Sequence, residues 1–475
     1  MTLISDLTDL LGPAHVLTGA DTARLAQDWT GKYTGTPVAV VRPGNTADVA
    51  ACLRLAARHG VAVVPVSGNT GLVGGTHTTN GLLLSLERMN RIRDLNPVTR
   101  TATVEAGVIL SALHDAAAEQ GLYFPLWFGA RGSAMIGGVL STNAGGSNVL
   151  RYGSTRSLCL GLEVVLADGR VLNLMTALHK DNSGYALRDL FIGAEGTLGI
   201  ITAAVMKLVP APHAHATATL ALRNTGDALA LLNRLQEASG GLVEAFEFMP
   251  ASYSRRLAQV RPDLGLPFAT VPEVTILTEL GATAPVLCEA RSDGSVPLGD
   301  LLEATVAGLM EEGLITDAIV AQSEAQRRAM WARREAAAEI TFAKRPFVDT
   351  DIAVPLDRAA DFLTAMHARL QGLDQAHETL TVAHLGDGNL HFTVFPVDGS
   401  EATYDRVITM IEEVVADLRG SFSAEHGVGL SKLSSMARRK DAVALDVMRA
   451  IKAALDPEGR MNPGKVIPAE STPLP

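Results

Sequence analysis

Hydrophobic and polar positions along residues 37–68 predict a β-strand, a helix and a second β-strand. PVAVVRP (37–43) and VAVVPVSG (61–68) are short apolar runs of the kind found in buried strands. NTADVAACLRLAARHG (45–60) has apolar residues at helical spacing, with a capping Asn45 and a terminal Gly60. Other elements expected before residue 211 are two short helices within 1–30, strands at 81–89, 101–108 and 196–210, and a hairpin at 163–174. This part of the chain is therefore expected to combine helices and strands.

The pattern changes after PAPHAHA (210–216). Strand-like and helix-like segments then alternate, which predicts an α+β domain on one antiparallel sheet. The expected strands are 217–223, 244–250, 273–281, 350–356 and 390–395, and the expected helices are 227–235, a long Ala- and Arg-rich helix at 323–345, and most of 402–455. A second domain is therefore expected to begin near residue 212.

Composition narrows the class of protein. A chain of 475 residues is too long for one ordinary core, which supports at least two domains. A hydrophobic content of 47% indicates a globular protein, and a net charge of −11 argues against a nucleic-acid surface. No apolar run approaches the roughly 18 residues of a membrane-spanning helix, and no lysine or arginine precedes Arg24, so neither a transmembrane segment nor a signal peptide is expected.

The three cysteines are far apart, and no CxxC occurs. This spacing is not that of a disulfide framework and is typical of a reducing compartment. We therefore expect an intracellular, cytoplasmic protein.

Three glycine-rich stretches offer backbone N–H groups to a ligand. PVSGNTGLVGGT (65–76) follows a predicted strand and could bind a phosphate, or it could be a plain glycine loop. GARGSAMIGGVLSTNAGGSNVLRYGS (129–154) is not expected to form the interior of a helix or strand, and it could line a polar cofactor or act as a linker. GAEGTLGIIT (193–202) is a third glycine turn that enters a strand. Three such turns suggest one extended ligand with a pyrophosphate.

GRMNPGK (459–465) has the spacing of a nucleotide-binding P-loop but not its context. Val466 stands where Ser or Thr is needed, and no strand precedes the motif. A P-loop is therefore not expected.

HLGDGNLH (384–391) and EHGVG (425–429) contain the clearest chemistry in the chain. The turn can bring His384 and His391 together, and Glu425 could add an oxygen ligand. Two histidines and one carboxylate suit Zn²⁺, Mn²⁺ or Fe²⁺. The same residues could equally be two histidines that hydrogen-bond around a tight turn, so spacing alone leaves both readings open.

Six motifs in order resemble one known family. PVSGNTGLVGG, IGGVLSTNAGG, DNSGYALRDLFIGAEGTLGIIT, HLGDGNLH, EHGVG and MNPGKV together are similar to the FAD-linked D-2-hydroxy-acid dehydrogenases, over roughly residues 35–466. This family includes D-lactate, D-2-hydroxyglutarate and glycolate dehydrogenases. The resemblance implies an α+β protein with an FAD-binding domain of the vanillyl-alcohol-oxidase type at 1–211, a ferredoxin-like antiparallel-sheet cap (substrate) domain at 212–420, and a C-terminal helical segment at 421–475 that returns to the FAD domain.

The resemblance also implies non-covalent FAD, because the histidine that some relatives attach to the flavin has no counterpart here. The residues expected to bind FAD lie in the glycine-rich stretches and near the C-terminus. They are Pro65, Ser67, Gly68, Asn69, Thr70, Gly71, Leu72, Gly75, Thr76, Gly132, Ser133, Ile136, Gly137, Gly138, Ser141, Thr142, Asn143, Gly145, Gly146, Tyr152, Gly153, Glu195, Gly196, Gly199, Ile200, Ile201 and Asn462.

The resemblance shifts the balance at HLGDGNLH toward a metal. It implies that His384, His391 and Glu425 bind a divalent ion, often zinc in this family, and that His426 is the general base. A 2-hydroxy acid could then chelate the metal, lose its hydroxyl proton to His426 and pass a hydride from C2 to flavin N5. A small carboxylate substrate, an electron acceptor (electron-transfer flavoprotein, quinone or cytochrome) and a homodimer are the expected partners.

The expected substrate contacts are Arg334, Asn389 and Thr393. Arg334 follows Trp331 by three residues, as does the carboxylate-binding arginine of the family, and a guanidinium can bind a carboxylate through two hydrogen bonds. Its neighbour Arg327, seven residues earlier, is expected on the same helix face.

Three positions depart from the 2-hydroxyglutarate branch of the family. Ala338 replaces a threonine, Asp349 replaces a lysine and Thr393 replaces an asparagine. Either the substrate lacks a distal carboxylate, or Lys344 or Arg345 takes over, or the substrate carries a positive group there. Two other functions therefore stay open: a flavin oxidoreductase of the same fold that acts on an amino- or imino-dicarboxylate, and a metal hydrolase with structural glycine loops.

Overall fold

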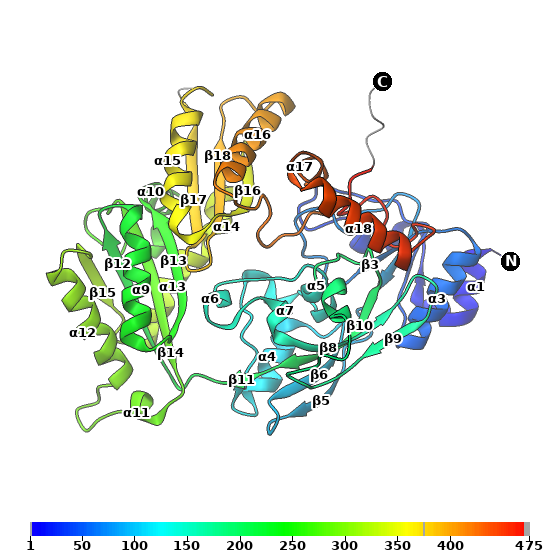
Figure 1. The fold of residues 1–475 in the computed structure, drawn as a ribbon, viewed down its shortest axis with the longest axis horizontal. Coiled ribbons are helices and arrows are strands. Elements are labelled where there is room, and N and C mark those ends of the chain that lie inside the picture. The colour runs from blue at the N-terminus through cyan, green and yellow to red at the C-terminus, as the bar shows by residue number, and fades with distance from the viewer. Residues whose placement is uncertain (1, 374–375, 470–475) are drawn as a thin grey trace. The chain divides into compact units, whose positions relative to one another are not determined.

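The computed structural model describes residues 2–373 and 376–469, which form two compact units. The first unit contains the chain up to Gly145, Gly153–Pro210 and the chain from Glu425 onward. The second contains Ala211–Ala424 and the short segment Gly146–Tyr152. Each unit has its own sheets and its own hydrophobic core (Figure 1).

The first unit is built on two main sheets. In the four-stranded sheet the order is β1-β2-β4-β3, with β2, β3 and β4 parallel and β1 antiparallel. In the five-stranded sheet the order is β5-β6-β10-β8-β9, and all neighbours are antiparallel. The strands of this unit are β1 (Val16–Leu17), β2 (Ala39–Val41), β3 (Val63–Val66), β4 (Leu82–Ser85), β5 (Ile92–Asn96), β6 (Thr101–Glu105), β7 (Leu122–Tyr123), β8 (Cys159–Val165), β9 (Val171–Leu174), β10 (Ile200–Lys207) and β11 (Val209–Pro210), the last paired with β7.

The strands of the four-stranded sheet carry apolar residues on both faces, and helices pack against one of these faces. Leu7 of α1 and Leu53 of α3 pack with Val41 and Leu82 in one cluster, while Val64 belongs to a cluster on the other face. The helices of the first unit are α1 (Leu3–Leu11), α2 (Ala23–Ala26), α3 (Thr46–Arg58), α4 (Leu110–Ala118), α5 (Ile136–Ser141), α7 (Thr155–Leu158), α8 (Leu187–Phe191), α17 (Leu433–Arg439) and α18 (Ala442–Leu455), with 3-10 turns η1 (Pro13–His15), η2 (Gly19–Thr22) and η3 (Gly129–Gly132).

The second unit is one seven-stranded antiparallel sheet with helices on both faces. The order is β15-β12-β14-β13-β17-β18-β16. The strands are β12 (Ala214–Leu222), β13 (Val243–Pro250), β14 (Val274–Ala282), β15 (Asp317–Val320), β16 (Val348–Ala353), β17 (Glu378–His384) and β18 (Asn389–Phe395). The helices are α6 (Val149–Tyr152), α9 (Ala228–Ser239), α10 (Ala251–Val260), α11 (Pro285–Cys288), α12 (Pro297–Glu311), α13 (Glu324–Glu335), α14 (Ala337–Phe342), α15 (Ala359–Leu370) and α16 (Glu401–Asp417), with 3-10 turns η4 (Thr225–Asp227), η5 (Pro262–Leu264) and η6 (Leu356–Arg358).

The alternation of side chains gives the two faces of this sheet different characters. Leu390, Phe392 and Val394 of β18 point into the large core that α9, α12, α15 and α16 cover. The opposite face carries a smaller apolar cluster under α10, α13 and α14. The second face therefore has room for polar side chains beside the small cluster.

The long helix predicted at 323–345 is wrong in one respect. It is divided into α13 and α14, with Ala336 acting as the C-cap of the first and the N-cap of the second. Ala336 and Ile340 are buried in the small cluster, so packing against the sheet decides the break despite high helix propensity.

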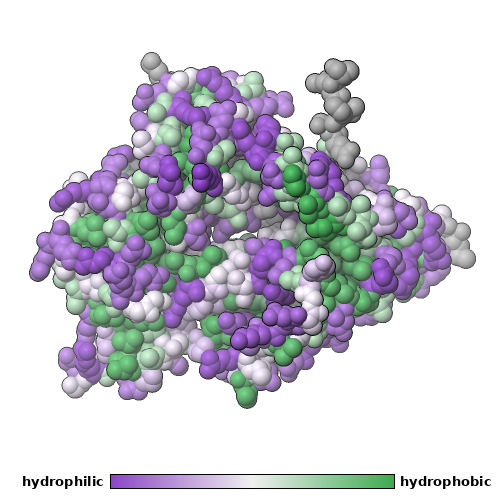
Figure 2. Space-filling view, in the orientation of Figure 1, coloured by the Kyte–Doolittle hydropathy of each residue, from purple (hydrophilic) through white to green (hydrophobic). Residues whose placement is uncertain are grey.

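The surface of the described residues mixes polar and apolar side chains, as expected for a globular protein. Hydrophilic and hydrophobic residues are intermixed over the visible face (Figure 2), and large exposed apolar side chains such as Val98 and Val286 are well separated in sequence. Within the described residues, every helix is too short or too polar to cross a membrane.

Candidate functional site

The first glycine loop follows β3 and is closed by one side chain. Asn69 has a φ of 52°, its Nδ2 donates to the carbonyl of Gln27 at 2.8 Å, and its Oδ1 accepts a hydrogen bond from Thr76 at 2.7 Å. A Cβ added at Gly68 would lie 2.1 Å from the carbonyl oxygen of Ser133. The loop at 65–76 and the stretch from residue 132, both predicted to bind the cofactor, therefore lie against each other.

The expectation that residues 129–154 avoid helix interiors is wrong for part of the stretch. Residues Ile136–Ser141 form α5, with Ile136 and Leu140 buried. A Cβ added at Gly137 would lie 2.8 Å from the Cβ of Ala106, so the glycine lets this short helix pack closely. Gly146 and Tyr152 lie in the segment that belongs to the second unit, where the Tyr152 hydroxyl donates to Glu244 at 2.6 Å.

Asn462 connects the other predicted cofactor segments. Its Nδ2 donates to the carbonyls of Gly75 at 3.0 Å and Glu195 at 2.7 Å. The Glu195 carboxylate in turn accepts the backbone N–H groups of Val428 at 2.7 Å and Gly429 at 2.9 Å, which fixes the loop that follows Glu425 and His426. Burial raises the pKa of Glu195, although these N–H groups oppose the rise.

Two features of this region point to a ligand. Asn69, Asn143, Glu195 and Asn462 are among the seven described non-glycine residues with positive φ. Such backbone is costly and gathers where a ligand is held. Asn462 is 2% exposed, yet its Oδ1 has no hydrogen-bond partner within the described chain. The residues present thus fit the predicted FAD, with a buried acceptor left for it.

Gly71 offers a direct test of the cofactor loop. An added Cβ would meet no protein atom within 4 Å, so Gly71→Ala is expected to leave the free energy of unfolding of the apoprotein unchanged. If the loop contacts FAD, the methyl group will lower FAD affinity about tenfold, the size expected for overpacking. Fluorescence titration of apoprotein with FAD measures this. Gly299→Ala, also in open space but in α12, is the control; equal FAD affinity in both variants would contradict the prediction.

His384 and His391 are brought together at the turn between β17 and β18. Their ring centroids are 5.6 Å apart, with the planes at 80°. The Asp387 carboxylate accepts the Asn389 N–H at 3.1 Å within the turn, and Gly388 has a φ of 81° where a Cβ would lie 2.3 Å from the carbonyl oxygen of Val354. The predicted turn is thus formed, and its glycine is required by the close backbone.

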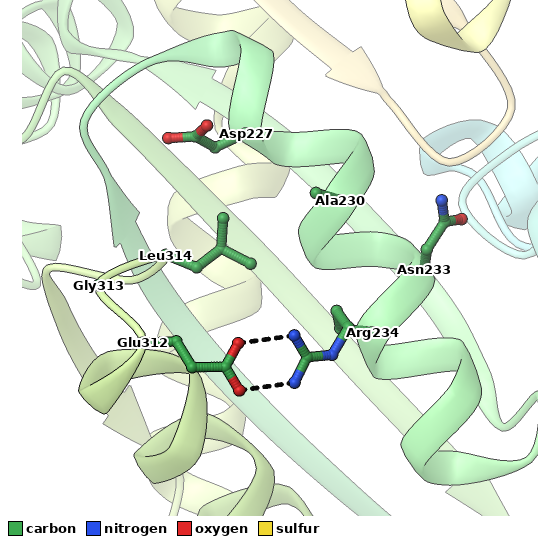
Figure 3. A pocket seen from close by; sticks show the side chains of 7 residues that line it. All are labelled: Asp227, Ala230, Asn233, Arg234, Glu312, Gly313 and Leu314. Carbon is green, nitrogen blue, oxygen red and sulfur yellow. Dashed lines mark hydrogen bonds and ion pairs between the residues drawn. The ribbon is translucent and has the colours of Figure 1, made fainter.

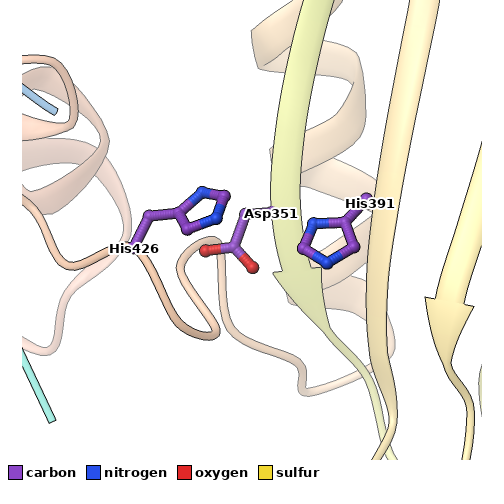
Figure 4. Close-up of side chains that lie close together, drawn as sticks. All are labelled: Asp351, His391 and His426. Atoms are coloured by element: carbon purple, nitrogen blue, oxygen red, sulfur yellow. The ribbon is translucent and has the colours of Figure 1, made fainter. Parts of the chain in front are cut away.

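Glu425 and His426 directly follow Ala424, whose N–H donates to the carbonyl of Asp351 at 3.2 Å. Two sets of potential ligands result, each with its ligand atoms within 4.8 Å of one another. One is His384, His391 and Glu425, and the other is Asp351, His391 and His426 (Figure 4). His391 is common to both, so the donor chemistry fits a divalent ion that could be held in either of two ways.

The predicted substrate residues lie on the polar face of the second unit. Arg334 is 8% exposed, and its Nε donates to Glu247 at 2.6 Å. The Thr393 hydroxyl donates to Asp349 at 2.7 Å, and the two residues are paired across β18 and β16. Asn389 donates from Nδ2 to Asp351 at 2.9 Å, and its buried Oδ1 has no partner among the described residues.

Sequence reasoning missed two buried carboxylates, Glu247 and Asp351. Glu247 bonds both Arg334 and the Nδ1 of His384, the latter at 2.8 Å. Asp351 is 2% exposed and is paired across the sheet with His391. The available signal was a pair of acidic residues within a strand-like segment, as in EAFEFMP (244–250) and VDTDIA (348–353).

One further cluster of charged residues and one surface hollow fit a functional site less well. His215, Glu244 and Glu279 also come together, but Arg151 and Arg327 already pair with the two carboxylates. A hollow of about 520 Å³ lies between α9 and α12, where Arg234 and Glu312 bond each other through two contacts of 2.6 and 2.7 Å (Figure 3). None of the predicted site residues lines this hollow.

Two family models cover most of the chain. Residues 37–175 match the family described as FAD binding domain, and residues 211–466 match FAD linked oxidases, C-terminal domain. The chain is 38% identical over 461 residues to the D-2-hydroxyglutarate dehydrogenase of Xanthomonas citri pv. viticola, covering 96% of this chain and 94% of the relative. It is also 38% identical to the mitochondrial D-2-hydroxyglutarate dehydrogenase of Bos taurus, covering 94% of this chain and 79% of the relative.

Solved structures with low sequence identity share the fold. p-Cresol methylhydroxylase with substrate bound has a TM-score of 0.71 at 15% identity, covering 98% of this chain and 96% of that one. 4-Ethylphenol oxidase from Gulosibacter chungangensis has a TM-score of 0.69 at 19% identity, covering 98% and 97%. The predicted α+β fold of the vanillyl-alcohol-oxidase type is confirmed.

Proposed function

Because the chain belongs to the family of FAD-linked D-2-hydroxy-acid dehydrogenases, and so oxidises a D-2-hydroxy acid with FAD, we propose that the reaction is assisted by a divalent metal. The FAD-binding match leaves the hydrolase alternative without support. The observation that carries the proposal is the meeting of His384, His391 and Glu425.

The residues of this chain have separable tasks in the proposed reaction. Arg334 binds the substrate carboxylate, since a guanidinium presents paired donors to two oxygens. His384, His391 and Glu425 hold the metal, which when bound would polarise the C2 hydroxyl and make it more acidic. His426 accepts the hydroxyl proton on its imidazole. FAD, when bound, would supply the two-electron redox chemistry of the oxidation.

Removing one ligand tests the metal site. His384→Ala is expected to lower metal affinity by more than the roughly 10–100-fold typical of losing an outer partner of a ligand. Elemental analysis after dialysis against a chelator measures the loss. His367→Ala, which removes an exposed histidine from α15, is the control. Unchanged metal content in His384→Ala would rule out this set of ligands.

The far end of the substrate is proposed to differ from that of D-2-hydroxyglutarate. Asp349 lies two residues before Asp351 on β16, so both side chains share the face that carries His391. Lys344 bonds Glu378 at 2.7 Å, and Arg345 lies over the ring of Phe347. These bases are engaged elsewhere, which supports a substrate whose distal group donates hydrogen bonds or is positive. An amino- or imino-dicarboxylate stays the second candidate, although its distal carboxylate would need another partner than Asp349.

The electron acceptor is proposed from the family resemblance alone. Electron-transfer flavoprotein, a quinone and a cytochrome are the three candidates. A cytoplasmic location and a homodimer likewise stay predictions.

A further inference from the structure

Glu247 is a buried carboxylate between two groups of the proposed reaction. It lies on β13, next to β17, and its Cα is paired with that of His384. Its side chain is completely buried. One oxygen, Oε2, accepts the Nε–H of Arg334 at 2.6 Å, and the other, Oε1, lies 2.8 Å from Nδ1 of His384. Each carboxylate oxygen thus serves a different partner.

Glu247 lies between a guanidinium and an imidazole. Nε of Arg334 and Nδ1 of His384 each lie within hydrogen-bond distance of a different carboxylate oxygen, so both oxygens of this buried side chain are paired. An ionised carboxylate beside Nδ1 accepts the hydrogen of that nitrogen, so Nε2 of His384 keeps its lone pair. The ring nitrogen that can bind a metal is therefore selected by Glu247.

The same carboxylate orients Arg334. The Glu247 carboxylate accepts a hydrogen bond only from Nε of Arg334. Neither Nη nitrogen of Arg334 donates a hydrogen bond within residues 2–373 and 376–469. Both Nη groups therefore remain for a ligand carboxylate, which matches the paired geometry that guanidinium offers. The buried pair holds a long side chain that otherwise has many rotamers.

We propose that Glu247 is a positioning residue that fixes the metal-binding nitrogen of His384 and the carboxylate-binding end of Arg334 together. The inference rests on the proposed function, because it assigns His384 to the metal and Arg334 to the substrate. It adds that both depend on one side chain, so a single substitution should disturb both.

Glu247→Gln tests the proposal, with Glu279→Gln as its matched control. Glutamine keeps the size of the side chain but loses the charge. Glu279 is also buried, lies on the same face of the sheet, and pairs with Arg327 and Trp331 instead. For Glu247→Gln we expect a metal dissociation constant raised about 10–100-fold, as for other outer partners of metal ligands. At saturating metal, KM for the hydroxy acid should still be higher than in wild type, and the fold-change in KM should exceed that in kcat. The reason is that Arg334 is no longer held in place by Glu247.

Metal binding, ligand geometry and KM are all measured on the FAD-loaded protein. Chelator competition gives the affinity for Zn²⁺, and the absorption spectrum of bound Co²⁺ reports on ligand geometry. The proposal would be overturned if Glu247→Gln kept the Zn²⁺ affinity, the Co²⁺ spectrum and the KM of wild type. It would also be overturned if Glu279→Gln lost Zn²⁺ affinity and raised KM to the same extent. Glu247→Asp, which keeps the charge, should fall between wild type and Glu247→Gln; if it is worse than Glu247→Gln, charge positioning is wrong. A wild-type protein that binds no metal would instead refute the metal site, and KM alone would then decide the role of Glu247.

Discussion

Replacing His426 by glutamine is expected to slow reduction of the bound flavin by about 10²–10⁴-fold, the usual cost of losing a general base. Glutamine fills a similar space but cannot accept a proton. The Glu195 carboxylate holds the backbone of Val428 and Gly429 just beyond this residue, so the loop should keep its conformation in the variant. The effect should therefore fall on the chemical step.

Anaerobic stopped-flow measurement of flavin bleaching gives the rate, and FAD and metal contents are measured on the same sample. Both contents should match those of wild type. The alternative set of ligands, Asp351, His391 and His426, predicts a different result. If metal content falls in His426→Gln and in Asp351→Asn but not in Glu425→Gln, His426 is a ligand rather than the base. An unchanged bleaching rate with full metal content would contradict both roles.

The sequence was sufficient for features that depend on local pattern. β17, the turn and β18 were predictable because the alternation of Asn389, His391 and Thr393 with Leu390 and Phe392 assigns each residue to a face. The ligand-binding role of the glycine loops stays a prediction, made from their content of glycine and short polar residues. α5 was missed because Gly137 makes sense in a helix only once Ala106 packs against it.

Residues that act through tertiary contacts were beyond such reasoning. Glu247 lies 137 positions before His384 and 87 before Arg334, and no periodicity joins them. The pairing of β13 with β17 brings them together. Arg327 and Arg334 were expected on one helix face, and they do meet carboxylates on the same face of the sheet. The contact of Arg334 with Glu247 could not be predicted, because it depends on the pairing of β13 with β17.

Replacing Asp349 by lysine is expected to raise kcat/KM for D-2-hydroxyglutarate by at least about tenfold, since exchanging a like-charge contact for an opposite one is worth more than the roughly 1.4 kcal/mol of a tenfold change. Asp349 and Asp351 are two residues apart on one strand, so their Cα atoms are about 7 Å apart. A substrate held near His391 by its hydroxyl and first carboxylate could extend a distal group along the strand to Asp349. A distal carboxylate would meet repulsion there in the natural protein.

The comparison needs substrates that differ only at the far end and a control for overall charge. D-2-hydroxyglutarate, D-lactate and a D-2-hydroxy acid with a terminal ammonium group provide the first. Asp405→Lys provides the second, because Asp405 is exposed on α16, which packs on the opposite face of the sheet. Asp349→Lys should gain on the dicarboxylate and lose on the ammonium substrate, while Asp405→Lys should change neither. If wild type already prefers D-2-hydroxyglutarate and Asp349→Lys does not improve it, the distal carboxylate binds elsewhere and Asp349 does not select the substrate.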